Sequence, residues 1–542
     1  MEEKLYTKPC AVQKIETSQG FSVSYNEHLL YSKYNPKKNI ISAVENLQLL
    51  PGTIILCCSP LLGYGIEELL QKLPENSLIV FCEAEQALFD FTITEKSLEF
   101  SDDRILNCPP EKLNDLPLKL YDLAATGLYK RVIRLDMSAG TQFNKNYYDK
   151  LFSACSDSVM TFWKNRITLT KFGRRYSKNL FTNLHYLAES RPITDFIGTV
   201  NKPILVFGAG ESTQNLINEL LHSSNNDADW FNSFFILCAD TAMQPLLKNG
   251  IHPDGVFIEE AQSVITKAFI GVPDDIQIFA GLSSIPTIAH KTKRKNISYF
   301  FTEYTKASFI DSLKTKSFMP PSNMPFGSVG LTAVYYALKF RKDESIPVFV
   351  TGLDFSYSTG VTHTKGALAH IIRLITGNKL NSIANYNAAY GTGTEKISDK
   401  TGKTFITTPA LKNYAMMFNN FFNDAKNLYD SGECGIPLIL PRKLPEITET
   451  KELHINESSL SQNQKNEIRE YLSNEKKSLE YLRDLLTGKT ELTGDTLLEE
   501  IKKTAEPREY LYLHFADGWK FSTSQSFLNR IRTEIDFFLK FM

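Results

Sequence analysis

The chain has 542 residues, of which 42% are hydrophobic and 22% are charged, and its formal net charge is −1 at pH 7. At roughly 100–200 residues per domain, this length predicts two to four domains. The balanced charge provides no broad basic surface of the kind that binds nucleic acid. No apolar run reaches the roughly 18–20 residues of a membrane span, and the N-terminus lacks the apolar segment of a signal peptide. We therefore expect a cytoplasmic protein with no nucleic acid partner and no membrane span.

The cysteines and histidines give no metal-binding pattern. The chain has eight cysteines but no CxxC pair, and its nine histidines are scattered. Structural zinc sites need closely spaced ligand pairs, and disulfide frameworks belong to smaller, cysteine-rich secreted chains. The sequence therefore predicts neither a metal site nor a disulfide framework.

The first region, residues 1–190, alternates apolar strands with helical stretches. The strand candidates are TIILCCS, SLIVFCEAE and RVIRLD, and one of the helical stretches is IEELLQKL. This alternation is typical of βαβ units around a parallel sheet. The SPLLGYG turn with Glu83 about twenty residues later is a degenerate form of a nucleotide-binding fingerprint, so we favour a non-catalytic Rossmann-like domain that docks the acceptor protein. The segment FWKNRITLTKFGRRYSKNLFTNLHYL then has helical periodicity and predicts a connecting helix.

The second region, residues 191–442, carries a longer series of strands. The candidates are ILVFGAG, FFILCAD, GVFIEE, IQIFAGL, ISYFFTE and IPVFVTGLDF, with helices such as VGLTAVYYALKF between them. Near-continuous apolar strands are expected when helices cover both faces of a parallel sheet. Residues 443–542 then form helical, charge-rich segments. We therefore predict an α/β fold with two Rossmann-like parallel-sheet domains followed by a small helical C-terminal domain.

Polar and glycine residues follow the strands of the second region, where open parallel sheets bind their ligands. Gly208 and Gly210 follow the first strand, and Ser212 begins a helix whose N-terminus offers N–H donors to a phosphate. Such a turn is also found where only a tight turn is needed. Asp240 and Thr241 end the second strand, and Glu259 and Glu260 end the third; these side chains suit a ribose or a sugar.

A second group of candidates lies further along this region. Ser328 and Gly330 form a small-residue turn at the start of a long helix, which predicts a second anion or ribose site. Gly352 and Asp354 end the strand that follows. A charge after an apolar strand needs a hydrogen-bond partner, so Asp354 is either a structural cap or a contact to the ligand.

His363 lies shortly after this strand end, in the segment VTHTKG. Histidine is the usual general base near neutral pH, although a loop histidine can equally be a simple surface residue. Its position next to the GLDFSY strand end makes it the candidate base.

These motifs together resemble the motility accessory factor family, proposed flagellin nonulosonate transferases. The matching segments are VFGAGEST, ADTAMQPLLKNGIHPDGVFIEE, GSVGLTAVYYAL, GLDFSYSTGVTH and YDSGECGIP, with EHLLYSKYNPKKNI and FWKNRITLTKFG before them. The resemblance covers roughly residues 21–442. It implies transfer of a nonulosonic acid from a CMP-linked donor to Ser or Thr of flagellin.

The central region also resembles bacterial sialyltransferases and the archaeal 6-hydroxymethylpterin pyrophosphokinases. The sialyltransferase resemblance implies that Tyr357 assists the departing phosphate and that His363 is the base. Residues Gly208, Gly210, Ser212, Asp240, Thr241, Glu259, Ser328, Gly330, Gly352 and Asp354 would surround the donor. The motifs require no metal ion for such a transfer, although Mg²⁺ is possible; the pyrophosphokinase alternative would need ATP and Mg²⁺. A flagellin-binding assembly factor without catalysis is the third interpretation.

Two departures from the family pattern bear on the donor. The family has Gly-Pro-Ser after its first glycines, where this chain has Gly210-Glu211-Ser212, and it has Asp-Pro where this chain has Glu259-Glu260. A carboxylate beside a phosphate repels it by several kcal/mol at an effective dielectric constant of about 20. Glu211 is therefore expected to point away, to meet a cation or to indicate a changed donor.

Overall fold

The computed structural model describes residues 12–223, 230–291, 296–359, 361–380, 388, 390–447, 453, 455 and 458–542. Its contacts divide the chain into two compact units, residues 1–173 with 512–522 and residues 174–511 with 523–542. The domain boundaries expected at residues 190 and 442 stay predictions. No helix among the described residues is both long and apolar enough to cross a bilayer.

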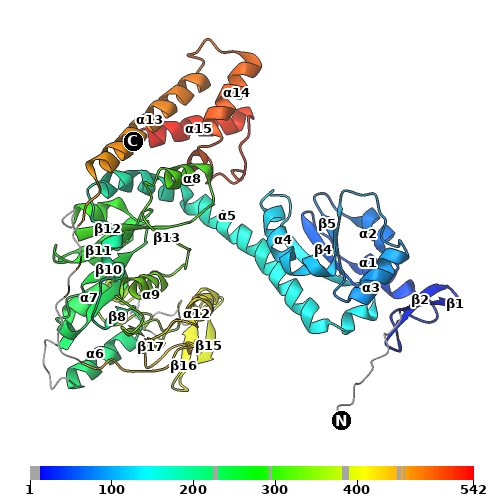
Figure 1. Ribbon diagram of the computed structural model, residues 1–542, viewed down its shortest axis with the longest axis horizontal. Helices are drawn as coiled ribbons and strands as arrows, with labels where there is room; N and C mark the ends of the chain where they lie inside the picture. The colour runs from blue at the N-terminus through cyan, green and yellow to red at the C-terminus, as the bar shows by residue number, and fades with distance from the viewer. Residues whose placement is uncertain are drawn as a thin grey trace. The chain divides into compact units, whose positions relative to one another are not determined.

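The first unit contains a parallel four-stranded sheet in the order β6-β5-β4-β7 (Figure 1). Helices α1 and α2 share one apolar core with it, and the start of α5 (Lys145–Leu187) shares another. The bounds are β4 (Thr53–Cys58), β5 (Leu78–Cys82), β6 (Ile105–Cys108), β7 (Arg131–Asp136), α1 (Lys38–Asn46), α2 (Ile66–Lys72), α3 (Gln86–Thr94) and α4 (Leu116–Ala124). A small antiparallel sheet, β1 (Gln13–Thr17), β2 (Gly20–Tyr25) and β3 (His28–Leu29), precedes it.

Helix α5 is continuous over 43 residues and contains the predicted connecting helix. The two units divide inside it, between Gly173 and Arg174. Its first part also binds a C-terminal segment of the first unit, because the Arg166 guanidinium donates to the carbonyls of Leu513 and Phe515 at 2.9 and 2.7 Å. This return of the chain to the first unit has no signal in the sequence.

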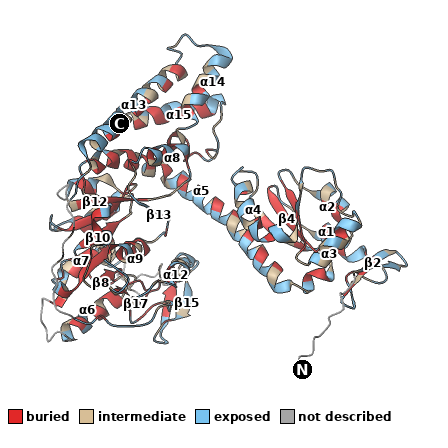
Figure 2. Ribbon diagram, viewed as in Figure 1, coloured by how far each residue is buried: buried red, intermediate tan, exposed pale blue. Residues whose placement is uncertain are grey.

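The second unit is built on an eight-stranded parallel sheet in the order β13-β12-β11-β10-β9-β8-β14-β17. Every residue of β8, β9, β10, β11 and β14 is buried (Figure 2), as their apolar sequences predict. The strand bounds are β8 (Ile204–Phe207), β9 (Phe235–Ala239), β10 (Gly255–Ile258), β11 (Gln277–Gly281), β12 (Ile297–Thr302), β13 (Ser322–Asn323), β14 (Val348–Thr351) and β17 (Leu428–Asp430). A separate hairpin pairs β15 (Glu395–Ser398) with β16 (Thr404–Thr407).

The order of these strands reverses at β8. From β8 the chain builds outward through β9 to β13, and then it returns to place β14 and β17 on the other side of β8. The helices of this unit are α6 (Ser212–Ser223), α7 (Asp240–Lys248), α8 (Ser308–Thr315), α9 (Val329–Phe340), α10 (Leu368–Thr376) and α12 (Pro409–Phe422). Open sheets bind ligands at the carboxyl ends of the strands flanking such a reversal. A ligand site is therefore expected at the carboxyl ends of β8 and β14.

Three helices form the C-terminal region, as predicted: α13 (Gln462–Leu486), α14 (Gly494–Ala505) and α15 (Gln525–Phe538). A buried polar network joins α13 to the segment between α14 and α15. The Glu475 carboxylate accepts from the Arg508 guanidinium at 2.9 and 3.0 Å and from the Tyr510 hydroxyl at 2.6 Å. The predicted fold class, two parallel-sheet domains with a helical C-terminal region, is confirmed.

We predict that Glu475→Ala destabilises the protein by about 3–5 kcal/mol, because it leaves the Arg508 charge buried without its partner. Chemical denaturation followed by circular dichroism measures this loss. Glu467→Ala, which removes an exposed carboxylate from the same helix, should change stability by less than about 0.5 kcal/mol. Equal effects of the two substitutions would contradict the importance of the network.

Candidate active site

The loops that follow β8 and β14 touch each other through glycines. The amides of Gly208 and Gly210 donate to the carbonyls of Thr351 and Gly352 at 2.8 and 2.9 Å. A Cβ atom on Gly208 would lie 2.3 Å from the Gly352 carbonyl oxygen, and Gly352 itself has a φ of +71°. These glycines are thus required by the contact between the two loops, in addition to any role in ligand binding.

Asp354 caps helix α6. Its carboxylate accepts from the Ser212 amide at 3.0 Å and from the Ser212 hydroxyl, and the Cys434 thiol lies 3.5 Å from it. Burial raises the pKa of Asp354, and the hydrogen bonds from Ser212 oppose that shift. The carboxylate lies where a phosphate would bind at this helix N-terminus. Ser212 is fully buried and occupied by these contacts.

More carboxylates surround this cap. Glu211 follows Gly210, and its Oε2 atom is buried with no hydrogen-bond partner among the described residues. Asp399 has one similar oxygen, Oδ2. The Lys400 ammonium forms an ion pair with Asp430 and donates to the Gly432 carbonyl at 3.3 Å. Glu211 therefore does not point into solvent, and the end of the strands is rich in negative charge.

His363 lies in a loop that is attached to the glycine turn. The amide of Thr364 donates to the Ala209 carbonyl at 2.8 Å. The His363 Nδ1 atom lies 3.2 Å from the Thr362 hydroxyl, to which Arg373 also donates at 3.2 Å. Burial, and then the positive charge of Arg373, lowers the pKa of His363. The imidazole is therefore neutral at pH 7, the form that a general base needs.

Tyr357 lies on the same segment, between Asp354 and His363. It pairs with Ile406 of the β15–β16 hairpin, and its hydroxyl donates to the Ala388 carbonyl at 2.6 Å. Its ring is buried, and burial raises the pKa of the phenol. The hydroxyl is therefore held by the backbone in this structure.

A second group of acids lies at the ends of β9 and β10. The Glu259 carboxylate accepts from the Thr332 hydroxyl at 2.9 Å and from the Thr302 hydroxyl. Burial, reinforced by Glu260 and Glu259, raises the pKa of Asp240 to about 7, while hydrogen bonds from Thr241 oppose the shift. Burial also raises the pKa of Glu259, which the hydrogen bonds from Thr302 and Thr332 oppose. Three acids whose charges influence one another thus lie together at the ends of β9 and β10.

Helix α5 holds the loops that carry this second group. The Asn183 amide donates to the carbonyls of Leu282 and Ser284, both at 2.9 Å, and the Asn179 amide donates to those of Ala261 and Ser283 at 3.3 and 3.1 Å. Both asparagines are buried. They fix the segments after β10 and β11 by satisfying backbone carbonyls that no strand pairs.

The start of α9 joins the two groups. Ser328 precedes the helix and makes no capping hydrogen bond with its side chain. A Cβ atom on Gly330 would lie 2.3 Å from the Leu353 side chain beside Asp354, and Thr332 one turn later donates to Glu259. The predicted residues from five separate segments therefore gather at the carboxyl ends of β8, β9, β10 and β14.

The sequence did not single out Thr364 or the two asparagines of α5. The Thr364 hydroxyl is buried, next to the candidate base, and has no hydrogen-bond partner among the residues that the structure describes. The VTHTKG segment places it beside His363, but only the structure shows its amide on the glycine turn. Among the described residues, no cluster of three or more His, Cys, Asp or Glu side chains has the geometry to hold a metal ion.

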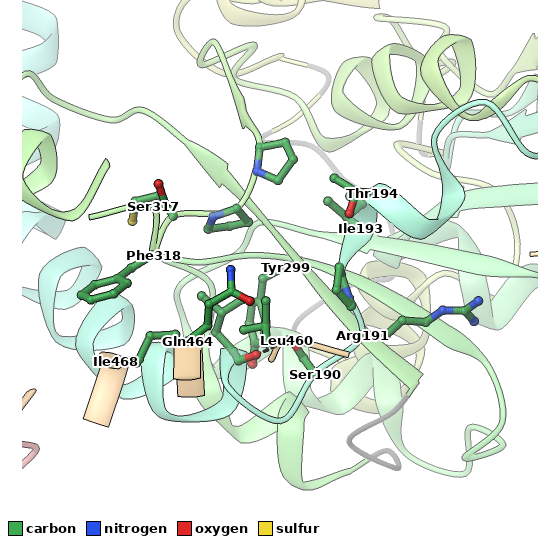
Figure 3. A pocket seen from close by; sticks show the side chains of 15 residues that line it. Ser190, Arg191, Ile193, Thr194, Tyr299, Ser317, Phe318, Leu460, Gln464 and Ile468 are labelled. Carbon is green, nitrogen blue, oxygen red and sulfur yellow. Dashed lines mark hydrogen bonds between the residues drawn. The ribbon is translucent and has the colours of Figure 1, made fainter. Parts of the chain in front are cut away.

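A cavity of about 140 Å³ lies elsewhere in the second unit (Figure 3). Tyr299 of β12, Phe318, Leu460 and Ile468 line it, and Gln464 of α13 lies beside them. None of the predicted site residues contributes to its wall. This cavity is therefore separate from the candidate site.

We predict that Asp240→Asn gains stability relative to the natural protein as the pH rises from 4 to 7. A buried acid with a raised pKa keeps a proton that the unfolded chain loses, so its contribution is present below pH 4 and is lost as the pH approaches 7. The relative gain is about 4 kcal/mol at most, for a shift of about three pKa units. Denaturation curves at pH 4 to 8 measure it, with the exposed Asp275→Asn as control. A gain that does not depend on pH would contradict the raised pKa.

Comparison with known proteins places the chain in a family. A family model described as 6-hydroxymethylpterin diphosphokinase MptE-like matches residues 178–360. An uncharacterized protein of Treponema pallidum (strain Nichols) is 30% identical over 558 residues, covering 97% of this chain and 94% of that protein. The structure of MAf glycosyltransferase from Magnetospirillum magneticum AMB-1 matches with a TM-score of 0.54 and 13% identity, over 98% of this chain and 91% of that chain. The chain therefore belongs to the family of the Treponema pallidum protein, and it carries the MptE-like domain and the motility accessory factor fold that its motifs predicted.

Proposed function

We propose that this protein is a glycosyltransferase that moves a nonulosonic acid from a CMP-linked donor to Ser or Thr hydroxyls of flagellin. The observation that carries the proposal is the attachment of the His363 loop to the glycine turn at the reversal of the sheet, through Thr364 and Ala209. This contact brings a neutral imidazole to the place where open sheets bind nucleotides. The fold shared with the MAf glycosyltransferase supports the same reaction class.

The donor is proposed to lie across the ends of β8 and β14, against the start of α9. Asp354 already occupies the N-terminus of α6. The donor phosphate is therefore assigned to the other helix start, where Ser328 makes no side-chain cap and Gly330 adds no side chain. Asp240 and Thr241, at the end of β9, are assigned to the ribose or the sugar.

The proposed transfer step is a single displacement. His363 takes the proton of the acceptor hydroxyl as its oxygen bonds to the anomeric carbon, and the bond from that carbon to the phosphate oxygen breaks with both electrons leaving on CMP. Positioning and charge stabilisation then supply most of the rate enhancement. Tyr357 can assist the departing phosphate only if its hydroxyl exchanges the Ala388 carbonyl for the phosphate oxygen.

A diphosphokinase acting on a small molecule is the second candidate. The acids Asp240 and Glu260 favour it, because Mg²⁺ bound to ATP is held by one or two protein carboxylates together with the phosphates, which needs no cluster of three acids. The MptE-like match over residues 178–360 also favours it. A third candidate is a flagellin-binding assembly factor without catalysis, supported by the carboxylate that already caps α6.

Titration with CMP and with ATP, each with and without Mg²⁺, separates these candidates. We predict that CMP binds without Mg²⁺ and that Glu211→Gln binds it several-fold more tightly, because the substitution removes a negative charge at the start of the neighbouring helix α6 that repels the donor phosphate held at α9. Glu433→Gln, which removes an exposed carboxylate nearby, is the matched control. Tight binding of ATP only with Mg²⁺ would support the diphosphokinase, and binding of neither nucleotide would support the assembly factor.

We predict that His363→Asn lowers the transfer rate about 10²–10⁴-fold while CMP affinity stays near that of the natural protein. Because the pKa of His363 is lowered, the rate of the natural protein should stay high below pH 6.5 and fall only at lower pH. Flagellin modification followed by intact-mass spectrometry measures the rate. His252→Asn, at a surface histidine of the same unit, is the control; full activity of the His363 variant would place the base elsewhere, with His370 the next residue to test.

A further inference from the structure

Helix α10 exposes an apolar stripe that a globular protein normally buries. Leu368, Ile371, Ile372 and Ile375 repeat at the spacing of one helix face. None of the helix residues is buried, and Ile371, Leu374 and Ile375 are 37%, 50% and 77% exposed. An amphipathic helix with an uncovered apolar face is the signature of a binding surface.

The charges in the chain segment that carries this helix all have one sign. Residues 355–380 contain no Asp or Glu, but they contain Lys365, Arg373 and Lys379. Lys365 and Lys379 are exposed, and no ion pair is recorded for them in the described part of the chain. A partner that covers the stripe must therefore offer apolar side chains together with negative charge.

The same helix is connected to the candidate base through one hydroxyl group. Arg373 on its polar side donates to the Thr362 hydroxyl, which lies 3.2 Å from the His363 ring. Because Arg373 lies on the side of the helix opposite the stripe, a polypeptide docked on the stripe reaches His363 with residues that extend past the short helix. At about 13 Å, the helix is long enough for two turns of a partner helix.

We propose that α10 docks an acidic, amphipathic segment of the acceptor polypeptide and so delivers its hydroxyl to His363. This rests on the proposed function for the delivery step, but the docking of the segment does not depend on transfer. An anionic membrane surface is the competing occupant. The short helix and its link to the His363 loop through Arg373 and Thr362 favour a polypeptide.

The docking step is tested with the full chain and two synthetic helical peptides. Both peptides have a leucine face; one has glutamates and the other has lysines on the polar face. The glutamate peptide should bind at least about tenfold more tightly than the lysine peptide, and added salt should weaken its binding. Ile371→Gln with Ile375→Gln should weaken it about tenfold or more, since exposed apolar anchors carry most of such affinity.

The controls separate docking from folding and from donor binding. Ile270→Gln changes an isoleucine that is 66% exposed elsewhere in the unit and should leave binding unchanged. The melting temperature and CMP affinity of the double variant should match those of the natural protein. At limiting flagellin, the double variant should modify flagellin more slowly, with an unchanged rate at saturation.

Three results would overturn the docking proposal: equal binding of the two peptides, unchanged binding by the double variant, or an equal loss in Ile270→Gln. Sedimentation with vesicles containing 30% phosphatidylserine, lost in the double variant, would assign the stripe to a membrane surface instead. If the natural protein binds the glutamate peptide but binds neither CMP nor a CMP-linked sugar, the proposed function is contradicted. The docking proposal is still supported by that result.

Discussion

The candidate site depends on the contact between the loops after β8 and β14. Two parallel strands bring these loops together at the point where the strand order reverses, and only glycine allows their backbones to approach so closely. The Ser212 hydroxyl accepts from the Gly352 amide at 2.9 Å and donates to Asp354. Each of these groups satisfies the hydrogen-bonding capacity of another, so the two loops form one support to which the His363 loop is attached.

The two joined loops have an electrostatic consequence. Asp354 neutralises the positive end of α6 from within the protein, and Glu211 and Asp399 each add a buried oxygen that has no partner in the described part of the chain. Among these groups the Lys400 ammonium pairs with Asp430, and its charge also opposes the raised pKa of Asp354. Unpartnered buried carboxylate oxygens are costly to keep, and natural proteins retain such groups where a ligand or a reaction uses them.

The sequence predicted the elements of the second unit well because buried parallel strands and their glycine turns have a strong local signal. It placed Gly208, Gly352 and Asp354 at strand ends, but it left open whether Asp354 caps a helix or meets a ligand. That choice depends on a contact between residues 142 positions apart, Ser212 and Asp354, which no local pattern contains. The binding of residues 513 and 515 by Arg166 was missed for the same reason.

The two helix starts at the site now differ in a way that the sequence alone did not show. Both α6 and α9 follow small-residue turns, and each could hold a phosphate by its free amides. At α6 the Ser212 amide already has a carboxylate, and a phosphate there would meet Asp354 and Glu211 as like charges. At α9 the residue before the helix is an uncharged serine without a side-chain cap. The Glu259 carboxylate, which contacts Thr332 of this helix, is held by the Thr302 and Thr332 hydroxyls. Charge repulsion therefore favours α9 over α6 as the helix that holds the phosphate in the proposed reaction.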